Sequence, residues 1–580
     1  MGRPGFSYTR PDANGPVTTV PDGPGRPVTA ASASPRLWLF GPLPDLLFGC
    51  GLLYAAVFVF QAAAGAQLSA WFPLAWLPFL TLVLGTPHYG ATLLRVYETR
   101  ESRQRYTFFA VYVSVALFAA YLFALRMHGF GSLLITLYLT WSPWHYSGQN
   151  YGVAVLFLGR AGVQVTPRAK RLLYFSFLLS FVLTVLALHV AESGTAYAPA
   201  AYQGTVYRLV PLGIPPAVHG VLFPAVLVAY LAVTFGALGM LARRASLGSL
   251  APAVLLVLTQ ALWFAVPTAA RHFGLLQGVH PLAAANGAYT VMWVAAGHFV
   301  QYLWITTYYG VATSTSQGKL QYLGKALLAG AAIWTLPTLI FAPGVLGSLP
   351  FDLGLGLLTA AVVNLHHFIL DGAIWKLRDG PVARVLLRSR EAAAPETAAP
   401  GRRWVAPVVW ATGVVCVVAT TLAFWEEAGL RRAAERNDVE RMRTALRRVE
   451  WIGRETPKAH VALAKYALRN RDARGARRHY QAALDLYPTS SAWAGIASLD
   501  EDQNDFDAAA VAWEAARALD PDDAMLHYRL GLARLRLDEP ERARQALARA
   551  AELAPEQRII QLKLEQAERR AAGSQDPGDG

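Results

Sequence analysis

Cysteine and charge are both scarce in this sequence. Of its 580 residues only two are cysteines, Cys50 and Cys416, and both lie inside apolar stretches. The count excludes a disulfide framework and a zinc site built on cysteines. Charged residues make up 16% of the chain, against about 25% in typical soluble domains. The hydrophobic content of 54% and the mean hydropathy of +0.31 therefore predict a membrane protein.

The signature motifs of several enzyme classes are absent as well. The sequence contains no P-loop, no Rossmann fingerprint and no serine-hydrolase motif, so nothing in it indicates ATP-driven or acyl-transfer chemistry. The net charge of +14 comes mostly from arginines near the ends of apolar runs. Because that distribution follows the positive-inside rule, we expect no nucleic-acid partner.

Apolar runs long enough to cross a bilayer recur through residues 44–425. The sequence predicts an all-α fold, in which a polytopic transmembrane bundle of about eleven spans is followed by a soluble helical solenoid. Residues 1–43 are rich in Pro, Gly, Ser and Thr, which predicts a disordered arm. The predicted spans centre near Ala55, Pro78, Leu117, Leu137, Val182, Leu227, Val257, Val294, Trp334, Val362 and Val415.

Basic loops assign the two sides of the predicted bundle. Five basic clusters follow the even-numbered spans, and they lie at 95–105, 160–171, 243–244, 319–325 and 376–403. The connections at the opposite ends, such as 193–216 and 342–350, are nearly uncharged. Since basic loops stay in the cytoplasm, we predict a cytoplasmic N-terminus and an extracytoplasmic C-terminal part after Glu427. A bacterial inner membrane is the expected location.

The C-terminal part is polar and repeats a pattern. Its aligned segments end at Pro488, Pro521 and Pro555, which are 33 and 34 residues apart. Other matching positions are Leu530, Gly531, Ala533, Ala543 and Ala550. This pattern resembles the tetratricopeptide repeat (TPR) family. The resemblance implies stacked helical hairpins that bind a protein partner, and the alternative is a cap that only stabilises the bundle.

The resemblance also sets the remaining domain boundaries. We predict a TPR-like domain over residues 456–570, a helical connector over residues 426–455 and a disordered tail over residues 571–580. Three repeats are about the number at which stacked hairpins bury a continuous core.

Four of the predicted spans carry a histidine followed by an aromatic residue. The segments are His88-Tyr89, His145-Tyr146, His298-Phe299 and His366-His367-Phe368. All four lie on even-numbered spans, which run parallel. His88, His298 and His367 lie at similar distances from the cytoplasmic ends, and His145, 15 residues before Arg160, is placed deeper by the same count. Because polar groups inside a membrane are costly, their alignment predicts one shared site in the cytoplasmic half of the bilayer. The predicted metal ligands are His88, His145, His298, His366 and His367.

Polar residues accompany the histidines at helix-face spacings. They are candidates for orienting the ligands or binding substrate, and they comprise Thr92, Arg95, Gln149, Gln301, Asn364 and Asp371. Asp371 is also a candidate ligand. The aromatic residues would form the walls of an apolar pocket, and they are Tyr89, Tyr146, Phe299 and Phe368.

Imidazole nitrogen suits iron, copper or zinc, and we favour iron. In the chemistry and placement of these histidines, the bundle is similar to membrane non-haem iron enzymes: lipid desaturases, hydroxylases and bacterial carotene-cleaving oxygenases. The resemblance implies oxygen-dependent oxidation or hydroxylation of a lipid-like substrate. The sequence lacks the HxxxH and HxxHH boxes of desaturases, and no catalytic residue is carried over.

Other functions fit parts of the pattern. Single membrane histidines often only hydrogen-bond a neighbouring helix. A proton relay, or an anionic-substrate site that includes Arg95, would also use buried histidines. The Gly and Pro residues that interrupt several spans favour a transporter. The main alternative to a metalloenzyme is therefore a non-catalytic scaffold or transporter whose repeats recruit partners.

Overall fold

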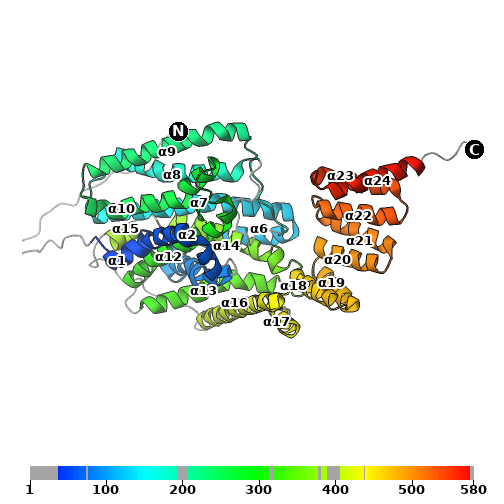
Figure 1. The fold of residues 1–580 in the computed structure, drawn as a ribbon. Helices are drawn as coiled ribbons and strands as arrows, with labels where there is room; N and C mark the ends of the chain where they lie inside the picture. Colours follow the sequence, from blue (N-terminus) through cyan, green and yellow to red (C-terminus); the bar gives the residue numbers. More distant parts are fainter. Residues whose placement is uncertain are drawn as a thin grey trace, which may run out of the picture.

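The computed structural model describes residues 37–72, 76–191, 205–313, 318–375, 380–387, 405–436 and 438–574. Within these ranges the chain forms helices and loops, with two isolated β-bridges and no strand. Two helical bodies stand side by side: a large bundle and a row of short hairpins drawn in orange and red (Figure 1). The predicted all-α fold is confirmed. We call residues 37–425 the apolar bundle and residues 456–574 the repeat domain.

Each of the eleven predicted apolar segments is helical. Several are interrupted by one π-helical turn, labelled η. In chain order they are η1 and α2 (Asp45–Gly49, Leu52–Trp71); α3, η3 and α4 (Leu77–Leu80, Thr81–Gly85, Thr86–Tyr97); η4 and α6 (Phe108–Val113, Ser114–Arg126); α7 (His128–Arg160); α8 (Pro167–His189); α9 (Pro216–Ala242); α10, η6 and α11 (Leu247–Gln260, Ala261–Ala265, Val266–His272); α12 (Gly287–Thr313); α13 (Lys319–Ile340); α14 (Leu355–Ile374); and α16 (Val405–Arg436). The short helix α1 (Pro42–Pro44) precedes them. The helices α5 (Arg100–Arg105) and α15 (Gly380–Leu387) and the 3-10 helices η7 (Ala284–Asn286) and η8 (Phe351–Leu353) lie between them.

The number of membrane-length helices is smaller than the eleven predicted spans. Among the described residues, seven helices are long and apolar enough to cross a membrane, and a pair bent by 60° at Gly49–Leu52 would make an eighth. The predicted segments near residues 78, 137 and 294 are not among the seven. These segments contain α4, α7 and α12, whose histidines and amides make them more polar.

The described basic loops gather at one end of the apolar bundle. There the Lys325 ammonium lies 2.8 Å from the Glu98 carboxylate, and Lys319 lies over the ring of Phe40. The Arg160 guanidinium donates to the backbone oxygens of Leu37, Trp38 and Leu386. The nearly uncharged connections meet at the opposite end, where the backbone N–H of Val206 donates to the Leu353 oxygen. This grouping agrees with the predicted sidedness, and the orientation in a membrane stays a prediction.

The folded part begins before the predicted boundary at residue 44. The Asp45 carboxylate accepts hydrogen bonds from the backbone N–H groups of Leu39 and Phe40, at 2.6 and 3.2 Å, and from the Trp304 indole at 2.9 Å. Residues 37–43 are therefore packed, and residues 1–36 of the predicted arm lie outside the described residues. At the other terminus, residues 571–574 of the predicted tail belong to a helix, and residues 575–580 lie outside the described ranges.

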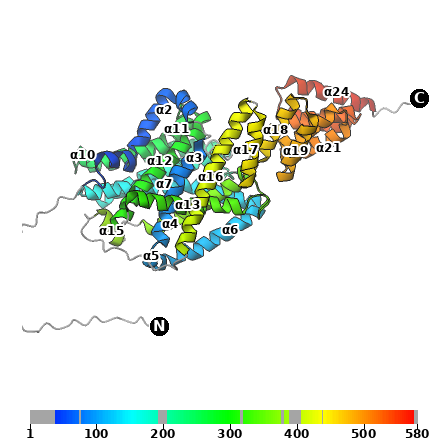
Figure 2. The same cartoon turned by 90° about the horizontal axis from the view of Figure 1, so that it is seen from below.

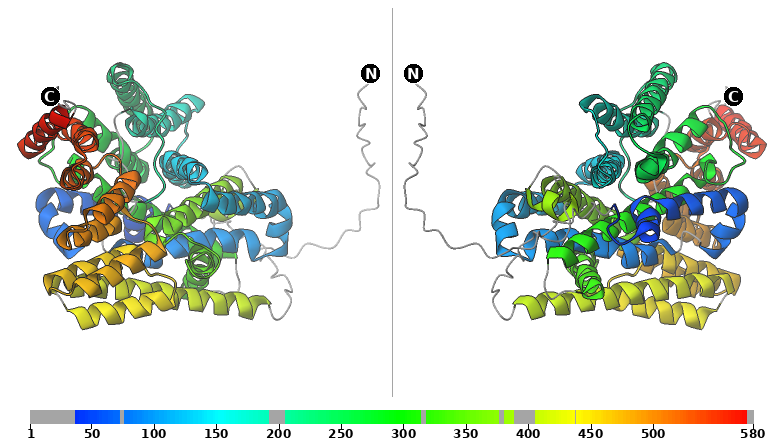
Figure 3. Two further views of the ribbon diagram at one scale, coloured as in Figure 1. Left: turned by 90° about the vertical axis from the view of Figure 1, so that its right-hand side faces the viewer. Right: turned by 90° about the vertical axis from the view of Figure 1, so that its left-hand side faces the viewer.

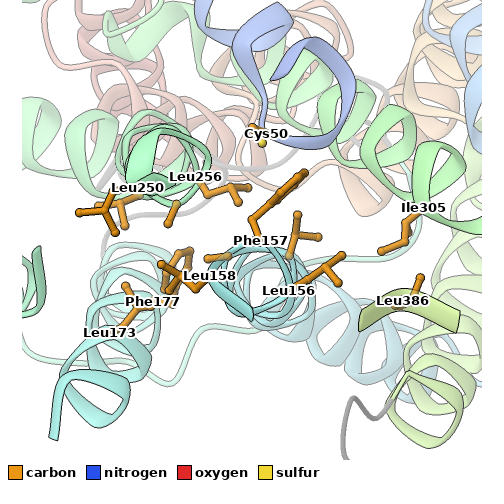
Figure 4. Packing of buried hydrophobic residues seen from close by; sticks show 14 of the residues in the cluster. Cys50, Leu156, Phe157, Leu158, Leu173, Phe177, Leu250, Leu256, Ile305 and Leu386 are labelled. Carbon is orange, nitrogen blue, oxygen red and sulfur yellow. The ribbon is translucent and has the colours of Figure 1, made fainter. Parts of the chain in front are cut away.

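A buried apolar core joins α7 to its neighbours near the basic end. Figure 4 shows Phe157 of α7 between Leu256 of α10 and Ile305 of α12, with Leu386 of α15 below Ile305. Phe157, Leu156 and Leu256 are at most 1% exposed. Close-packed side chains leave little room for movement. This core therefore holds α7 and α12 in place relative to each other, on the basic-loop side of the histidines.

The repeat domain is a stack of helical hairpins. The three predicted repeats correspond to α18–α19 (Pro457–Arg469, Ala473–Leu486), α20–α21 (Ser490–Asp502, Phe506–Leu519) and α22–α23 (Ala524–Arg536, Pro540–Leu553), and α24 (Arg558–Ser574) follows them. Small residues let the helices approach closely: Ala464, Ala483, Ala497 and Ala516 are fully buried along the stack. Stacked hairpins thus bury one continuous core, as the repeat pattern predicts.

Helix α16 leaves the apolar bundle and turns back through α17 (Val439–Trp451) into the repeat domain (Figures 2 and 3). The joint lies at the nearly uncharged end of the bundle. There the Arg454 guanidinium lies 3.3 Å from the ring centroid of Phe351, and Lys458 lies 3.9 Å from Asp352. The repeat domain is therefore attached at the end opposite the basic loops.

Candidate metal centre

Four helices of the apolar bundle bring four histidines together: His88 on α4, His145 on α7, His298 on α12 and His367 on α14. Their rings form a closed circle. Neighbouring ring centroids are separated by 4.8 Å from His88 to His298, 5.0 Å from His298 to His145, 4.9 Å from His145 to His367 and 4.2 Å from His367 to His88. One ring nitrogen from each lies within 4.8 Å of the others.

This spacing suits a single metal ion. Two imidazole nitrogens bound to one ion at about 2.1 Å can be at most about 4.2 Å apart. The observed set exceeds that limit by only about half an ångström, which small side-chain rotations would close. The rings of His88, His298 and His367 are at most 2% exposed, so the centre is enclosed by protein.

The ring nitrogens that face the centre have no hydrogen-bond partner among the residues that the structure describes. Both nitrogens of His88 and of His298 are buried without a partner, and so are Nε2 of His145 and Nε2 of His367. An unsatisfied buried polar group costs about 1–3 kcal/mol. Several such groups facing one another are costly for a bundle that only needs packing, whereas a bound cation would use their lone pairs.

The aromatic residue after each histidine packs against the next histidine in the circle. Tyr146 stacks on His298 at 4.0 Å and Phe368 stacks on His145 at 4.4 Å, between ring centroids. Phe299 lies 4.9 Å from His88, and Tyr89 lies 5.5 Å from His367. Neighbouring residues on a helix point about 100° apart. An aromatic that follows an inward-pointing histidine therefore faces the adjacent helix.

The single rotational sense of these contacts requires the four helices to run in the same direction. Contacts further along the helices agree. On α4 and α14, His88 meets His367 and, one turn later, Thr92 meets Asp371. On α4 and α12, His88 meets His298, and Arg95 lies over Tyr309 further along both helices. The helices are therefore parallel.

A hydrogen-bonded relay orients His367. The Thr92 hydroxyl donates to Oδ1 of Asp371 at 2.9 Å, so its oxygen is left to accept from Nδ1–H of His367 at 2.9 Å. This arrangement directs the lone pair of His367 Nε2 to the centre. A carboxylate that acts on a metal-binding histidine in this way sets the tautomer and raises the basicity of the ring.

Asp371 also lies beside the centre itself. Its Oδ2 is 3.4 Å from Nε2 of His367 and 3.8 Å from Nε2 of His145. Its Oδ1 accepts a second hydrogen bond, from the Tyr302 hydroxyl at 2.6 Å, and the Trp375 indole in turn donates to Tyr302 at 3.1 Å. The free edge of the carboxylate thus faces the ring nitrogens.

Tyr302 was not predicted from the sequence. It packs against His88 with 4.4 Å between ring centroids and covers the circle on the side that faces the basic loops. Its spacing from His298, four residues along the same helix, was the one available signal. Many aromatic residues in apolar helices share that spacing, so the signal was weak.

The predicted amides brace the helices behind the rings. Gln149 donates to Gln301 at 2.5 Å, and Gln301 donates to Asn150 at 3.0 Å and to the backbone oxygen of Gly49 at 2.8 Å. The chain continues from Asn150 to Gln260 at 2.9 Å. These bonds tie α12, α7 and α10 together at the level of the histidines. Their contact with the circle is limited to Gln149 and the backbone oxygen of His298, at 3.4 Å.

Asn364 acts on a pocket aromatic. Its side-chain oxygen accepts from the Tyr89 hydroxyl at 3.0 Å, and Tyr89 stacks on Trp334 of α13 at 5.4 Å. A close helix crossing makes this stack possible: a Cβ built on Gly330 would lie 1.6 Å from the backbone oxygen of Thr86. Helix α13 therefore approaches α4 with only hydrogens between the backbones.

Two predicted residues lie apart from the circle. Arg95 is two turns along α4 from His88, and its guanidinium lies over the ring of Tyr309 at 4.4 Å. His366 is the clearer difference from the prediction. It points to the other face of α14, where Nε2 lies 2.8 Å from the Ser114 hydroxyl. Adjacent helix positions differ by about 100°, so His366 and His367 do not reach the same centre.

Comparison with known proteins identifies one part of the chain. Residues 494–558 match the tetratricopeptide repeat family. The predicted TPR character of the C-terminal region is confirmed. No curated protein matches the sequence. The matched segment lies outside the apolar bundle, so the chemistry of the histidine circle has to be inferred from its geometry.

Proposed function

We propose that the protein is an integral-membrane metalloenzyme whose four histidines bind one iron ion. The observation that carries this proposal is the circle of buried imidazoles, whose facing nitrogens have no hydrogen-bond partner within the described part of the chain. The residues fit a transition-metal ion: four neutral nitrogen donors, a carboxylate alongside, and aromatic rings that exclude water. Imidazole donors also suit copper and zinc.

The reaction class that we propose is oxygen-dependent oxidation or hydroxylation of a lipid-like substrate. Iron, when bound, would supply the redox chemistry. The protein would hold the ion through His88, His145, His298 and His367. Asp371 and Thr92 would set the orientation of His367, and Tyr302 would hold the carboxylate in place. The aromatic walls favour a substrate that arrives from the lipid phase.

Metal analysis of the purified full-length protein tests this function. We expect about one iron per chain, and we expect it to be lost in the double variant His88→Ala/His367→Ala. His366→Ala is the matched control, because this histidine is adjacent in sequence and faces away. A wild-type protein that binds no stoichiometric metal after reconstitution, or a double variant that keeps its metal, would overturn the proposal.

The repeat domain supports a second, non-catalytic role, since TPR domains bind proteins. In that alternative the chain is a scaffold or transporter, and the repeats recruit a protein partner to the membrane. A protein partner at the repeats is part of both proposals, and a nucleic-acid partner is part of neither. Activity that survives loss of the histidine circle would favour the scaffold.

We also propose the predicted orientation. The basic loops would lie in the cytoplasm of a bacterial cell and the repeat domain would lie outside the inner membrane. The gathering of basic loops at the end of the bundle opposite the repeat domain supports this orientation. A reporter that is active only outside the cytoplasm, fused after Gly580, should be active. An inactive reporter on a stable fusion would reverse the topology.

A further inference from the structure

A cavity of about 340 Å³ lies on the other face of α14, between α4, α6 and α13. Its walls are mostly aliphatic and aromatic. The lining residues comprise Leu93, Tyr97, Ser114, Leu117, Phe118, Tyr121, Ile333, Pro337, Thr359, Val362, Val363 and His366. The lining contains no Asp, Glu, Lys or Arg, so the cavity suits a neutral molecule and lacks a partner for a phosphate or a carboxylate. The volume is at the lower end of the roughly 300–1,000 Å³ found for small-molecule sites.

A short chain of neutral polar groups marks one side of the cavity. Nε2 of His366 lies 2.8 Å from the Ser114 hydroxyl, and Ser114 lies 3.2 Å from the Tyr97 hydroxyl. Tyr97 donates to the backbone oxygen of Ala110 at 2.7 Å. Ala110 belongs to the π-helical turn η4 (Phe108–Val113), a kind of distortion that is frequent at functional sites. The Ser114 hydroxyl also donates to the Ala110 oxygen, at 3.0 Å. The hydroxyl oxygens can accept a further hydrogen bond, and the His366 ring can donate one to the oxygen of a bound molecule.

The cavity reaches the outer surface of the apolar bundle. Phe118, one of its lining residues, is 53% exposed. The helix from Phe108 to Arg126 is membrane-length and has only 17% of its most apolar window buried. In the proposed membrane location this helix would face lipid. A molecule with a ring in the cavity could therefore leave an apolar tail in the bilayer past Phe118.

The cavity is adjacent to the histidine circle but separated from it. His366 lines the cavity and His367 belongs to the circle, so one peptide bond joins the two sites. The Tyr89–Asn364 hydrogen bond lies on the α4–α14 contact near the circle. A molecule in the cavity could not place its own atoms on the bound ion. It could still exchange electrons with the ion over this short distance.

We propose that this cavity binds the ring of a membrane quinone or quinol, with one ring oxygen at His366 and Ser114. The role as an electron donor rests on the proposed iron centre, whereas binding does not. Oxidation of one quinol to the quinone releases two electrons and two protons. The two electrons would reduce Fe(III) to Fe(II) in two protein molecules, and the two protons would pass to the aqueous solvent.

Binding of decylubiquinone to the full-length protein in detergent, measured by calorimetry, tests the proposal. We expect saturable binding at one site. His366→Leu should raise the Kd about tenfold, because it removes one hydrogen bond. Val362→Phe should block the cavity, and Val415→Phe is its matched control because Val415 is 60% exposed on α16.

Two further variants separate this proposal from the proposed function. His88→Ala should lose iron and keep its quinone affinity, and His366→Leu should keep iron and lose quinone affinity. Failure of the iron centre alone would leave quinone binding intact. The cavity proposal is overturned if decylubiquinone does not bind, if His366→Leu and Val362→Phe bind it like the wild type, or if the wild type binds phospholipid there in its place.

The electron step has its own measurement. Anaerobic addition of decylubiquinol to the iron(III) protein should produce iron(II), seen as loss of the ferric electron paramagnetic resonance signal. The rate should fall at least about tenfold in His366→Leu and stay unchanged in Val415→Phe. Equal rates in the wild type and His366→Leu would remove the electron-donor role.

Discussion

The apolar bundle and the repeat domain are both helical, yet their polar side chains differ in where they lie. In the bundle the informative polar side chains are buried and converge, as His88, His298 and His367 do with at most 2% exposure. In the repeat domain many of them lie on the surface as ion pairs, such as Arg544 with Glu541 and Arg549 with Glu552. Buried polar groups that converge on one point in an apolar domain therefore indicate a candidate site, whereas the exposed charges of the repeat domain stay hydrated.

The starts of the helices show a second difference. Five of the six helices in the three repeats begin at side-chain caps, whereas α23 begins at Glu539 without one, and the capping residues are Thr456, Asp472, Thr489, Asp505 and Asp523. In the apolar bundle, α8 and α10 also begin at such caps, at Thr166 and Ser246, and α9 and α14 do not. Every helix leaves about four N–H groups unsatisfied at its start. A cap therefore stabilises a larger share of a short helix than of a long one.

The largest expected effect comes from the crossing of α4 and α13. Gly330→Val would place a Cβ 1.6 Å from the Thr86 backbone oxygen, and backbone cannot move aside as a side chain can. We expect loss of more than about 4 kcal/mol and no monodisperse protein in detergent. Gly324→Val on the same helix is the control, since nothing lies within 4 Å of its Cβ position. If the damage is confined to the apolar bundle, limited proteolysis should still release an intact repeat fragment.

Removing a core aromatic from the repeat domain should have the next largest effect. Trp513 is 4% exposed and its indole donates to Glu501 at 2.9 Å. Trp513→Ala should destabilise the repeats by about 3–5 kcal/mol while leaving the metal content unchanged. Thermal unfolding and metal analysis on the same sample would check both parts. Leu519→Ala, at a position 45% exposed, should change neither quantity, and loss of metal in Trp513→Ala would show that the two domains are coupled.

A smaller effect is expected at the carboxylate beside the histidines. Asp371→Asn keeps the shape of the side chain but removes the charge that orients His367 through Thr92. The affinity for iron should fall about 10–100-fold, measured by competition with a chelator. Asp45→Asn, at another fully buried carboxylate, is the matched control and should leave that affinity unchanged. Equal affinity in the wild type and Asp371→Asn would contradict the relay.

The smallest effect is expected where the two domains meet. Burial raises the pKa of Asp352 from 3.8 to about 6, although Lys458 opposes the shift. A raised folded-state pKa means that the protonated carboxyl favours folding. Its contribution is fully present below about pH 4 and is lost as the pH rises through 6. Thermal stability should therefore increase from pH 7 to pH 5, and Asp352→Asn should flatten that slope. An unchanged pH dependence of thermal stability in Asp352→Asn would mean that this carboxyl does not contribute to the pH dependence.

The sequence by itself determined the helical segments, the repeats and four members of the candidate site. Hydrophobic runs and the recurring prolines need no long-range information, because each pattern is local. The pairing of His88, His145 and His298 each with an aromatic residue was also visible. Counting residues from the basic loops then placed His88, His298 and His367 at a similar level on parallel helices and His145 deeper. The contacts agree for the first three, and they place His145 in the same circle.

Only the tertiary structure decided which residues near the histidines belong to the candidate site. The sequence does not distinguish His366 from His367, because both are histidines in the same helix. Their side chains point about 100° apart, so His366 lines the cavity and His367 belongs to the circle. Tyr302 became part of the site because α12 packs on α4 and α14, a long-range contact with no sequence signal. The order of the aromatics around the circle likewise depends on how four helices are arranged. Packing between segments far apart in the chain sets these relations, and a local pattern cannot record them.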